Sequence, residues 1–461
     1  MTALHDLSAE ALSKAYRTGE LSPVEVTRAC LARIDAWEGK INAMYIVSAE
    51  EALAQAAASE ARWRAGMPFS ALDGVPITIK DNIAVAGLAT PLGTAVGDMS
   101  PSAHDAPPVA RVREAGCVLL GKTTMPDFGM LVSGVSSLHG TTRNPWNTMR
   151  NPGGSSSGAG AATAAGYAPL ALGTDIAGSV RLPAAYNGVF ALKPSLGRVP
   201  ISPPFLGRVV GPITRTVGDA ALLMTALAQP DRRDFMALPE EKIAWGSLDA
   251  ELAGLRLGLM LDIGVGAKPQ PAVRAAIEAA AKAFEAGGAI VEPVTPFVTA
   301  EMMAGLDRFF QARLWAEVEV LAPDKTAKIL PFIVAWCRRA EKLSAADAAR
   351  SFARVMQIRE KAIAATAPYD FLISPTSPIT AYSATEAAPG EDPERPFEHV
   401  VFTAPFNMSE QPAASVCAGY DADGLPIGLQ IVGHRFDDLG VLRMARAYEA
   451  LRPPPRPWPV P

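Results

Sequence analysis

The chain has 461 residues, 49% hydrophobic and 19% charged, with a formal net charge of −5. This composition is typical of a folded protein with a large buried interior and argues against disorder. This net negative charge does not indicate the positively charged surface that nucleic-acid-binding proteins use, so nucleic acid is not expected as a partner. No uncharged apolar run of 18 residues predicts a membrane span, so no membrane partner is expected either.

The first part of the chain predicts alternating helices and short buried strands. Ser22, Pro23 and Glu25 supply an N-cap, a first-turn proline and a capping glutamate, so a helix is expected to begin there and run to about Gly39. Further helices are expected over 48–65, 107–115 and 158–165, and strands over 74–80, 117–120 and 189–192.

The second part continues the pattern, with helices expected over 215–228 and 271–287 and a strand over 256–261. A mainly helical stretch follows over 297–365. This mixture predicts an α/β protein, in which helices sandwich a mixed β-sheet. The length admits one large core with an insertion, or two domains.

Two turns rich in glycine and serine, at 153–158 and 173–183, are the strongest functional signal. A serine is a poor nucleophile unless a base takes its proton and donors receive the developing oxyanion. Glycines around Ser179 allow consecutive N–H groups to face one point. Lys80 ends an apolar run, where a buried strand would end. Together these residues indicate a hydroxyl nucleophile served by a lysine, although Lys80 taken alone would be a surface lysine.

These motifs resemble the amidase signature family: GGSSSG at 153–158, the GTDIAGSVRLPAAYNGVFALKPS run at 173–195, and GVPITIKD at 74–81. The likeness extends to 107–129, 139–146 and 424–433, and weakens between about 225 and 365. The resemblance implies a single domain over 1–461 with an α/β/α fold. It also implies a catalytic core over 66–200 and a variable, mainly helical region over about 225–365 that shapes the substrate pocket.

The resemblance implies a Ser-Ser-Lys triad. Ser179 would be the acyl nucleophile, Ser155 the bridging serine after a cis peptide bond, and Lys80 the general base. The oxyanion hole would be formed by the backbone N–H groups of Ile176, Ala177, Gly178 and Ser179. Many relatives have glycine at the position of Ala177. Alanine there affects the conformation of the loop, but its N–H group remains available as a donor.

The substrate-binding residues implied by the resemblance are Gly129, Met130 and Leu131, which would admit an apolar acyl or aryl group. Ordinary core packing is the alternative for these three residues. Arg181 would either contact an acidic substrate or form a structural ion pair with Asp175.

The implied activity is cofactor-independent hydrolysis of C–N acyl bonds in small amides, including aryl amides, and by the same chemistry of esters and carbamates (urethanes). An alternative within the same resemblance is an amidotransferase subunit that feeds ammonia to a tRNA-dependent complex. The segment FTAPFNMSEQPAASV at 402–416 departs from the Asn-x-x-Gly-x-Pro-Ala pattern expected of that subunit. A stand-alone enzyme, monomeric or homodimeric, is therefore expected.

Two other motifs suggest different functions. Gly154 to Gly158 fits the nucleophile elbow G-x-S-x-G, with Ser156, Asp370 and His434 in the order of an α/β-hydrolase. The segment before it is turn-rich rather than strand-like, which counts against an elbow. Residues 116–123 match a phosphate-binding loop, but a helix is expected before them and Pro126 follows, so Lys122 is expected to be structural.

Cysteine and histidine placement completes the sequence predictions. The four cysteines are widely spaced without a CxxC pair, which favours free thiols in a reducing compartment. The N-terminus lacks a secretory signal pattern, so a cytoplasmic location is expected. The five histidines include no i, i+4 pair, so neither a metal site nor a cofactor is expected.

Overall fold

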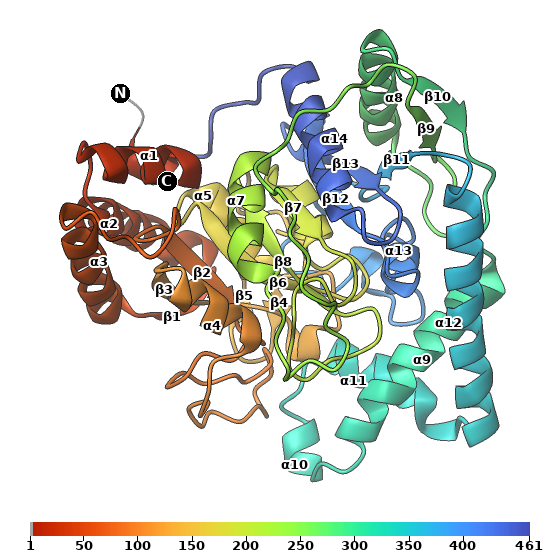
Figure 1. Cartoon of the computed structure of the whole chain (residues 1–461). Coiled ribbons are helices and arrows are strands. Elements are labelled where there is room, and N and C mark those ends of the chain that lie inside the picture. The colour runs from red at the N-terminus through yellow and green to blue at the C-terminus, as the bar shows by residue number, and fades with distance from the viewer. Residues whose placement is uncertain (1–2) are drawn as a thin grey trace.

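One mixed β-sheet runs through the molecule (Figure 1). The structure is a computed structural model that describes residues 3–461. Its eleven strands follow the order β1-β3-β2-β6-β8-β7-β12-β13-β11-β9-β10. The strands are β1 (Met44–Val47), β2 (Pro76–Lys80), β3 (Val118–Thr123), β6 (Leu170–Asp175), β7 (Phe190–Lys193), β8 (Val209–Thr214), β9 (Arg256–Leu259), β10 (Ile290–Pro293), β11 (Phe371–Pro375), β12 (Ala413–Tyr420) and β13 (Pro426–Val432). A two-stranded ribbon of β4 (Val135–Ser136) and β5 (Gly140–Thr141) lies apart from it.

The sheet is parallel at two places and antiparallel elsewhere. Strand β2 pairs in parallel with both β3 and β6, and β9 pairs in parallel with both β10 and β11. The other ladders, including β6 with β8 and β12 with β13, are antiparallel. The prediction of a mixed sheet is therefore confirmed.

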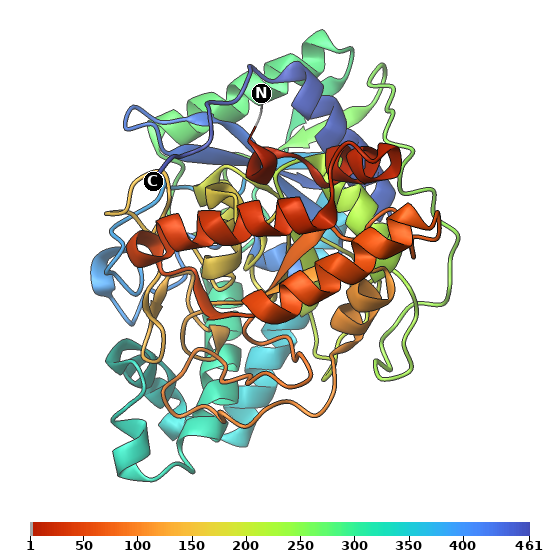
Figure 2. The same ribbon diagram turned by 90° about the vertical axis from the view of Figure 1, so that its left-hand side faces the viewer.

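Helices cover both faces of this sheet. They are α1 (Ala9–Thr18), α2 (Pro23–Ile41), α3 (Ala49–Arg64), α4 (Pro107–Glu114), α5 (Ser157–Ala165), α6 (Arg181–Asn187), α7 (Val217–Leu227), α8 (Pro271–Ala286), α9 (Ala300–Val318), α10 (Pro323–Thr326), α11 (Pro331–Arg338), α12 (Ala345–Thr366), α13 (Ala404–Met408) and α14 (Asp438–Leu451). Figure 2 shows α2 and α3 as two long red-orange helices on the N-terminal flank.

Alternation along β7 shows how the layers are built. Phe190 and Leu192 belong to the large hydrophobic cluster that includes α7 and α14, whereas Ala191 belongs to a smaller cluster with α5 and α6. Successive side chains of a strand point to opposite faces, so α7 and α14 cover one face and α5 and α6 the other. Helix α5 consists of Ser, Gly, Ala and Thr and is buried along its whole length, which allows it to lie close to the sheet.

The most helical region lies beyond this core. Helices α9 and α12 pack side by side at the lower right of Figure 1, with α11 beside α9 and α10 at the bottom of the view. Apolar residues of α9, α11 and α12 form, with Met130, Leu131 and Phe402, a hydrophobic cluster that is separate from the main core. The predicted helical stretch over 297–365 is thus confirmed. Within residues 3–461, none of the helices combines the length and the hydropathy needed to cross a membrane.

Candidate active site

The two glycine-serine turns meet at one edge of the sheet. Lys80 is the last residue of β2, and Asp175 is the last residue of its parallel neighbour β6. Because carboxyl ends of neighbouring parallel strands share an edge, the loop that carries Ser179 begins beside Lys80. The loop before α5 carries Ser155, and the Ser156 N–H donates to Ser179 O at 3.2 Å. Both glycine-serine turns therefore lie next to the end of β2.

Lys80 is buried and contacts two hydroxyl groups. Its Nζ atom donates to Ser155 Oγ and to Thr174 Oγ1, each at 2.8 Å. Burial lowers the pKa of Lys80 to about 7, against the opposing effect of the Asp175 and Asp81 charges. A substantial fraction of this lysine is thus neutral near pH 7, as a proton acceptor must be.

Ser155 follows a cis peptide bond, Gly154–Ser155, at the position expected from the resemblance. A Cβ atom at Gly154 would lie 2.4 Å from the Ser133 N atom, so only glycine fits there. A Cβ at Gly129 would lie 3.3 Å from Ser155 Oγ, and Gly129 has a φ of 68°. Gly154 therefore allows the backbone of Ser133 to approach closely, and Gly129 leaves room beside the Ser155 side chain.

The predicted oxyanion hole needs correction at one residue. The Gly178 N–H donates to Asp175 Oδ1 at 2.7 Å, because the carboxylate lies beneath the turn. The N–H groups of Ile176, Ala177 and Ser179 have no acceptor among residues 3–461. The turn thus offers three free donors rather than four.

Arg181 does not face a substrate. Its guanidinium is fully buried and donates to both Asp175 oxygens, at 3.0 and 3.1 Å. The remaining donors reach Thr403 O, Gln430 Oε1 and Asn407 Oδ1. Burial alone would raise the pKa of Asp175, but the charge and hydrogen bonds of Arg181 hold it well below its usual range. The substrate-binding interpretation is wrong, because every donor is already used; Arg181 is a structural hub.

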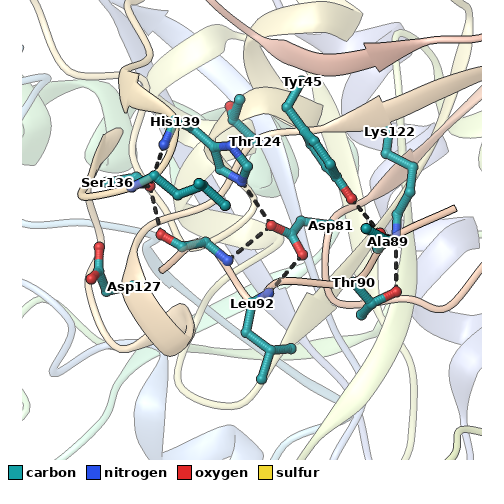
Figure 3. A network of polar contacts seen from close by, with 12 residues as sticks. Tyr45, Asp81, Ala89, Thr90, Leu92, Lys122, Thr124, Asp127, Ser136 and His139 are labelled. Carbon is teal, nitrogen blue, oxygen red and sulfur yellow. Dashed lines mark hydrogen bonds and ion pairs between the residues drawn. The ribbon is translucent and has the colours of Figure 1, made fainter. Parts of the chain in front are cut away.

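A second polar network fixes the segment that follows Lys80 (Figure 3). Asp81 accepts hydrogen bonds from the N–H groups of Leu92 and Gly93, at 3.0 and 2.8 Å. Its Oδ2 atom lies 2.8 Å from His139 Nε2, and the His139 ring stacks on Tyr45 with centroids 4.6 Å apart. No sequence motif assigned a role to Asp81 or His139, although Asp81 directly follows the lysine.

The residues of the competing motifs are used elsewhere. Ser156 Oγ donates to Thr174 O, His434 Nε2 lies 2.8 Å from Tyr369 O, and Asp370 accepts from the Arg256 N–H. Within residues 3–461 these three groups form no hydrogen bond with one another. Lys122 lies inside β3 and donates to Ala89 O and Thr90 Oγ1, so its structural role is confirmed and a phosphate loop is absent there.

Two cavities adjoin the site. The first, the Ala177 cavity, has a volume of about 300 Å³ and is lined by Ala177 and by apolar residues of α9 such as Met303 and Phe310. The second, the Met130 cavity, has a volume of about 470 Å³ and is lined by Met130 and Thr174. Leu131 packs in the hydrophobic cluster that includes α9 and α12.

No cluster of three or more His, Cys, Asp or Glu side chains arranged to hold a metal ion occurs in the part of the chain that the structure describes. All four cysteines are buried and unpaired within that part.

Comparisons with known proteins show which family this chain resembles. A family model described as Amidase matches residues 25–442. The chain is 35% identical to an acylamidase of Rhodococcus erythropolis, over 98% of this chain and 96% of that protein. It is also 35% identical to a glutamyl-tRNA(Gln) amidotransferase subunit of Symbiobacterium thermophilum, over 96% of both chains.

A solved structure agrees over the same length. The crystal structure of a bacterial aryl acylamidase of the amidase signature enzymes superimposes with a TM-score of 0.90 at 29% identity, covering 98% of this chain and 97% of that one. Sequence and structure therefore place the chain in the amidase signature family, as a hydrolase of the amidase type.

Proposed function

We propose that this protein is a stand-alone amidohydrolase in which Ser179, Ser155 and Lys80 form the catalytic triad. The observation that carries the proposal is the buried Lys80 amine, 2.8 Å from Ser155 Oγ, with a pKa of about 7. A lysine placed in this way can serve as a general base at neutral pH.

The proposed reaction moves one proton along this chain of groups. Neutral Lys80 accepts the Ser155 proton while Ser155 Oγ accepts the proton of Ser179. The Ser179 Oγ atom attacks the substrate carbonyl, and the resulting oxyanion is received by N–H groups of the turn. Collapse of the tetrahedral intermediate breaks the C–N bond, and the relay returns the proton to the departing nitrogen. Water then enters by the same route and hydrolyses the acyl-enzyme.

The donors proposed for the oxyanion are the N–H groups of Ile176, Ala177 and Ser179. They are free of acceptors within residues 3–461, and Asp175 fixes the turn by accepting from the N–H groups on either side of Ser179. A turn that is fixed before substrate binds need not reorganise during the reaction.

The proposed substrates are small amides, including aryl amides, and by the same acyl chemistry esters and carbamates. The similarity to an acylamidase and to an aryl acylamidase supports the proposal that the substrates are amides. The proposal that the region over about 225–365 shapes the pocket is supported by α9, which lines both cavities. A cytoplasmic location and a monomeric or homodimeric state remain part of the proposal.

The amidotransferase subunit is the second candidate, because the identity to such subunits is as high as to the acylamidase. Asn407, Pro412 and Ala413 fit the pattern expected of that subunit, and the departure falls on Glu410 alone. Glu410 has a φ of 64°, where glycine is the usual residue. The higher TM-score with the aryl acylamidase, 0.90 against 0.81 for an amidotransferase subunit from Thermotoga maritima, favours the stand-alone enzyme.

A labelling experiment tests the proposal. A fluorophosphonate should modify Ser179 in the purified chain, and peptide mapping should find no label on Ser156, whose hydroxyl is bonded to Thr174 O. The purified chain alone should hydrolyse a simple anilide. A label on Ser156 would overturn the triad, and activity that requires a co-purifying protein would favour the amidotransferase subunit.

A further inference from the structure

The Met130 cavity contains two arginine side chains besides the residues near Lys80. Arg208 lies just before β8 in the sequence, and Arg313 lies on α9. Thr174, which accepts a hydrogen bond from Lys80, lines the same cavity. The two arginines therefore border the space beside the proposed triad.

Neither guanidinium forms an ion pair with an acidic side chain among residues 3–461. Arg208 donates to a backbone oxygen, Pro203 O, and Arg313 lies over the Phe205 ring, 4.2 Å from its centroid. Glu317 lines the cavity one helical turn beyond Arg313, and its charge raises the pKa of that arginine from a distance without a direct contact. The positive charge of the cavity is thus only partly offset by the protein.

The two charges are close enough to influence one another. Burial lowers the pKa of Arg208 to about 10, and the charge of Arg313 contributes to the same decrease, while the charge of Asp234 opposes it. Burial also lowers the pKa of Arg313. Holding two partly desolvated like charges beside each other is unfavourable unless an anion binds between them. A face-on contact with an aromatic ring stabilises a guanidinium but supplies no countercharge.

We propose that the Met130 cavity binds a carboxylate of the substrate, so that the preferred amides carry an anionic group on one side of the scissile bond. This inference rests on the proposed function for the position of the scissile bond. A carboxylate would accept charge-assisted hydrogen bonds from the two guanidiniums. The Ala177 cavity is lined mainly by apolar side chains, and its two arginines, Arg339 and Arg395, are paired with Asp307 and Glu398. It would therefore hold the uncharged part of the substrate.

The proposal corrects the expectation that the cavity beside Met130 takes only apolar groups. Met130 and Phe128 supply an apolar wall, and the arginines supply the charge. The motif containing Met130 suggested the apolar character, but no sequence motif indicated that Arg208 and Arg313 line the same cavity. Their proximity depends on how α9 packs over the catalytic core.

Two matched substrate pairs test the proposal. In the first pair the acyl part varies: the 4-nitroanilide of succinic acid against that of 4-oxopentanoic acid, in which a methyl ketone replaces the carboxylate. In the second pair the amine part varies: 4-acetamidobenzoate against 4-acetamidoacetophenone. The measured quantity is the ratio of kcat/KM within each pair, so a uniform loss of activity does not affect it.

We expect the carboxylate member of one pair to be preferred by about 10–100-fold, as charge-assisted hydrogen bonds allow. Which pair shows the preference identifies the side of the scissile bond that carries the anion. Arg313→Gln and Arg208→Gln should each remove most of the preference. Arg308 is an exposed residue on the same helix, outside the cavity. Arg308→Gln removes an equal charge and should preserve the preference for the carboxylate substrate.

A binding measurement separates this inference from the proposed function. Calorimetry on Ser179→Ala gives the Kd of 4-acetamidobenzoate and of the succinic anilide without turnover. Weaker binding of one of them in the Ser179→Ala, Arg313→Gln double variant supports the arginine site even if no amide is hydrolysed. Equal ratios within both pairs, or a preference that Arg308→Gln reduces as much as Arg313→Gln does, overturns the proposal while amide hydrolysis itself stands.

Discussion

Thr174 Oγ1 lies 2.8 Å from the Nζ atom of Lys80, the same distance that separates this amine from Ser155. Thr174 is also bonded to Asn82, which donates to the hydroxyl at 3.1 Å. The amine is thus held between two hydroxyl groups. We infer that Thr174 is a positioning residue that keeps Lys80 directed at Ser155.

Replacing Thr174 by Val should reduce kcat for an anilide about 10-fold, because an isosteric side chain removes one hydrogen bond to the amine. Loss of an acceptor destabilises the ammonium form, so the pKa of Lys80 should fall further. The acidic limb of the pH–rate profile should therefore move to lower pH. The profile and kcat are measured together.

Thr174→Ser is the matched control, because it retains the hydroxyl and should restore both quantities. A Thr174→Val enzyme with the normal kcat and an unshifted profile would show that Ser155 alone positions the lysine.

The pH dependence of hydrolysis should follow the protonation of Lys80. The base acts only when neutral, and its pKa of about 7 places the change near neutrality. Activity should rise with pH through this value and level off in the mildly alkaline range. At pH 5, two units below the pKa, about 1% of the lysine is neutral, so kcat/KM should be about 100-fold below the plateau. A pH–rate profile on a neutral anilide measures this.

Variants test whether the protonation of Lys80 causes the rise in activity with pH. Lys80→Ala should reduce amide hydrolysis by about 10²–10⁴-fold, and ester hydrolysis by less, since an alkoxide needs less protonation than an amine. Lys193 is a useful control because burial also lowers its pKa to about 7. Lys193→Met should leave the midpoint in place. Loss of activity in His434→Ala but not in Lys80→Ala would contradict the lysine mechanism.

Sequence motifs located most of the candidate site because its groups lie in short, continuous segments. Lys80, Ser155 and Ser179 stand in the segments that carry the resemblance, and the structure brings those segments to one edge of the sheet. The prediction for the Gly178 N–H was wrong because its acceptor, Asp175, lies beneath the turn. That relationship depends on the local backbone path rather than on residue type.

Contacts between distant segments could not be predicted in this way. The donors of Arg181 reach Thr403, Asn407 and Gln430, more than 200 residues later in the chain. The helices over 215–228 and 271–287 were predicted closely because their composition and end residues are local signals. The antiparallel ladder of β12 and β13 was missed, since Val and Ile side chains that are buried on both faces show no alternation.

Breaking the Arg181–Asp175 pair should destabilise the protein strongly. Arg181→Met leaves the Asp175 carboxylate buried beside one remaining side-chain donor, Asn407, and such a loss costs about 3–5 kcal/mol. Urea denaturation of the variant measures the change in free energy of unfolding. Arg181→Lys should also destabilise, because an ammonium cannot reproduce the guanidinium's contacts. A stable Arg181→Lys enzyme with a raised KM would instead assign Arg181 to substrate binding.

Met130 should determine which acyl lengths the enzyme prefers, because it lines the cavity beside Thr174. Met130→Ala enlarges that cavity, so the relative kcat/KM should shift towards longer groups across a series of acyl anilides. A difference of one or two methylenes in such a pocket is worth about 1–3 kcal/mol, which corresponds to a clear change in ranking. Leu131→Ala is the matched control, because Leu131 packs in the same hydrophobic cluster as Met130 but does not line this cavity. It should lower the melting temperature without changing the ranking. If Met130→Ala lowers activity equally for every substrate, together with the melting temperature, then Met130 serves packing rather than recognition.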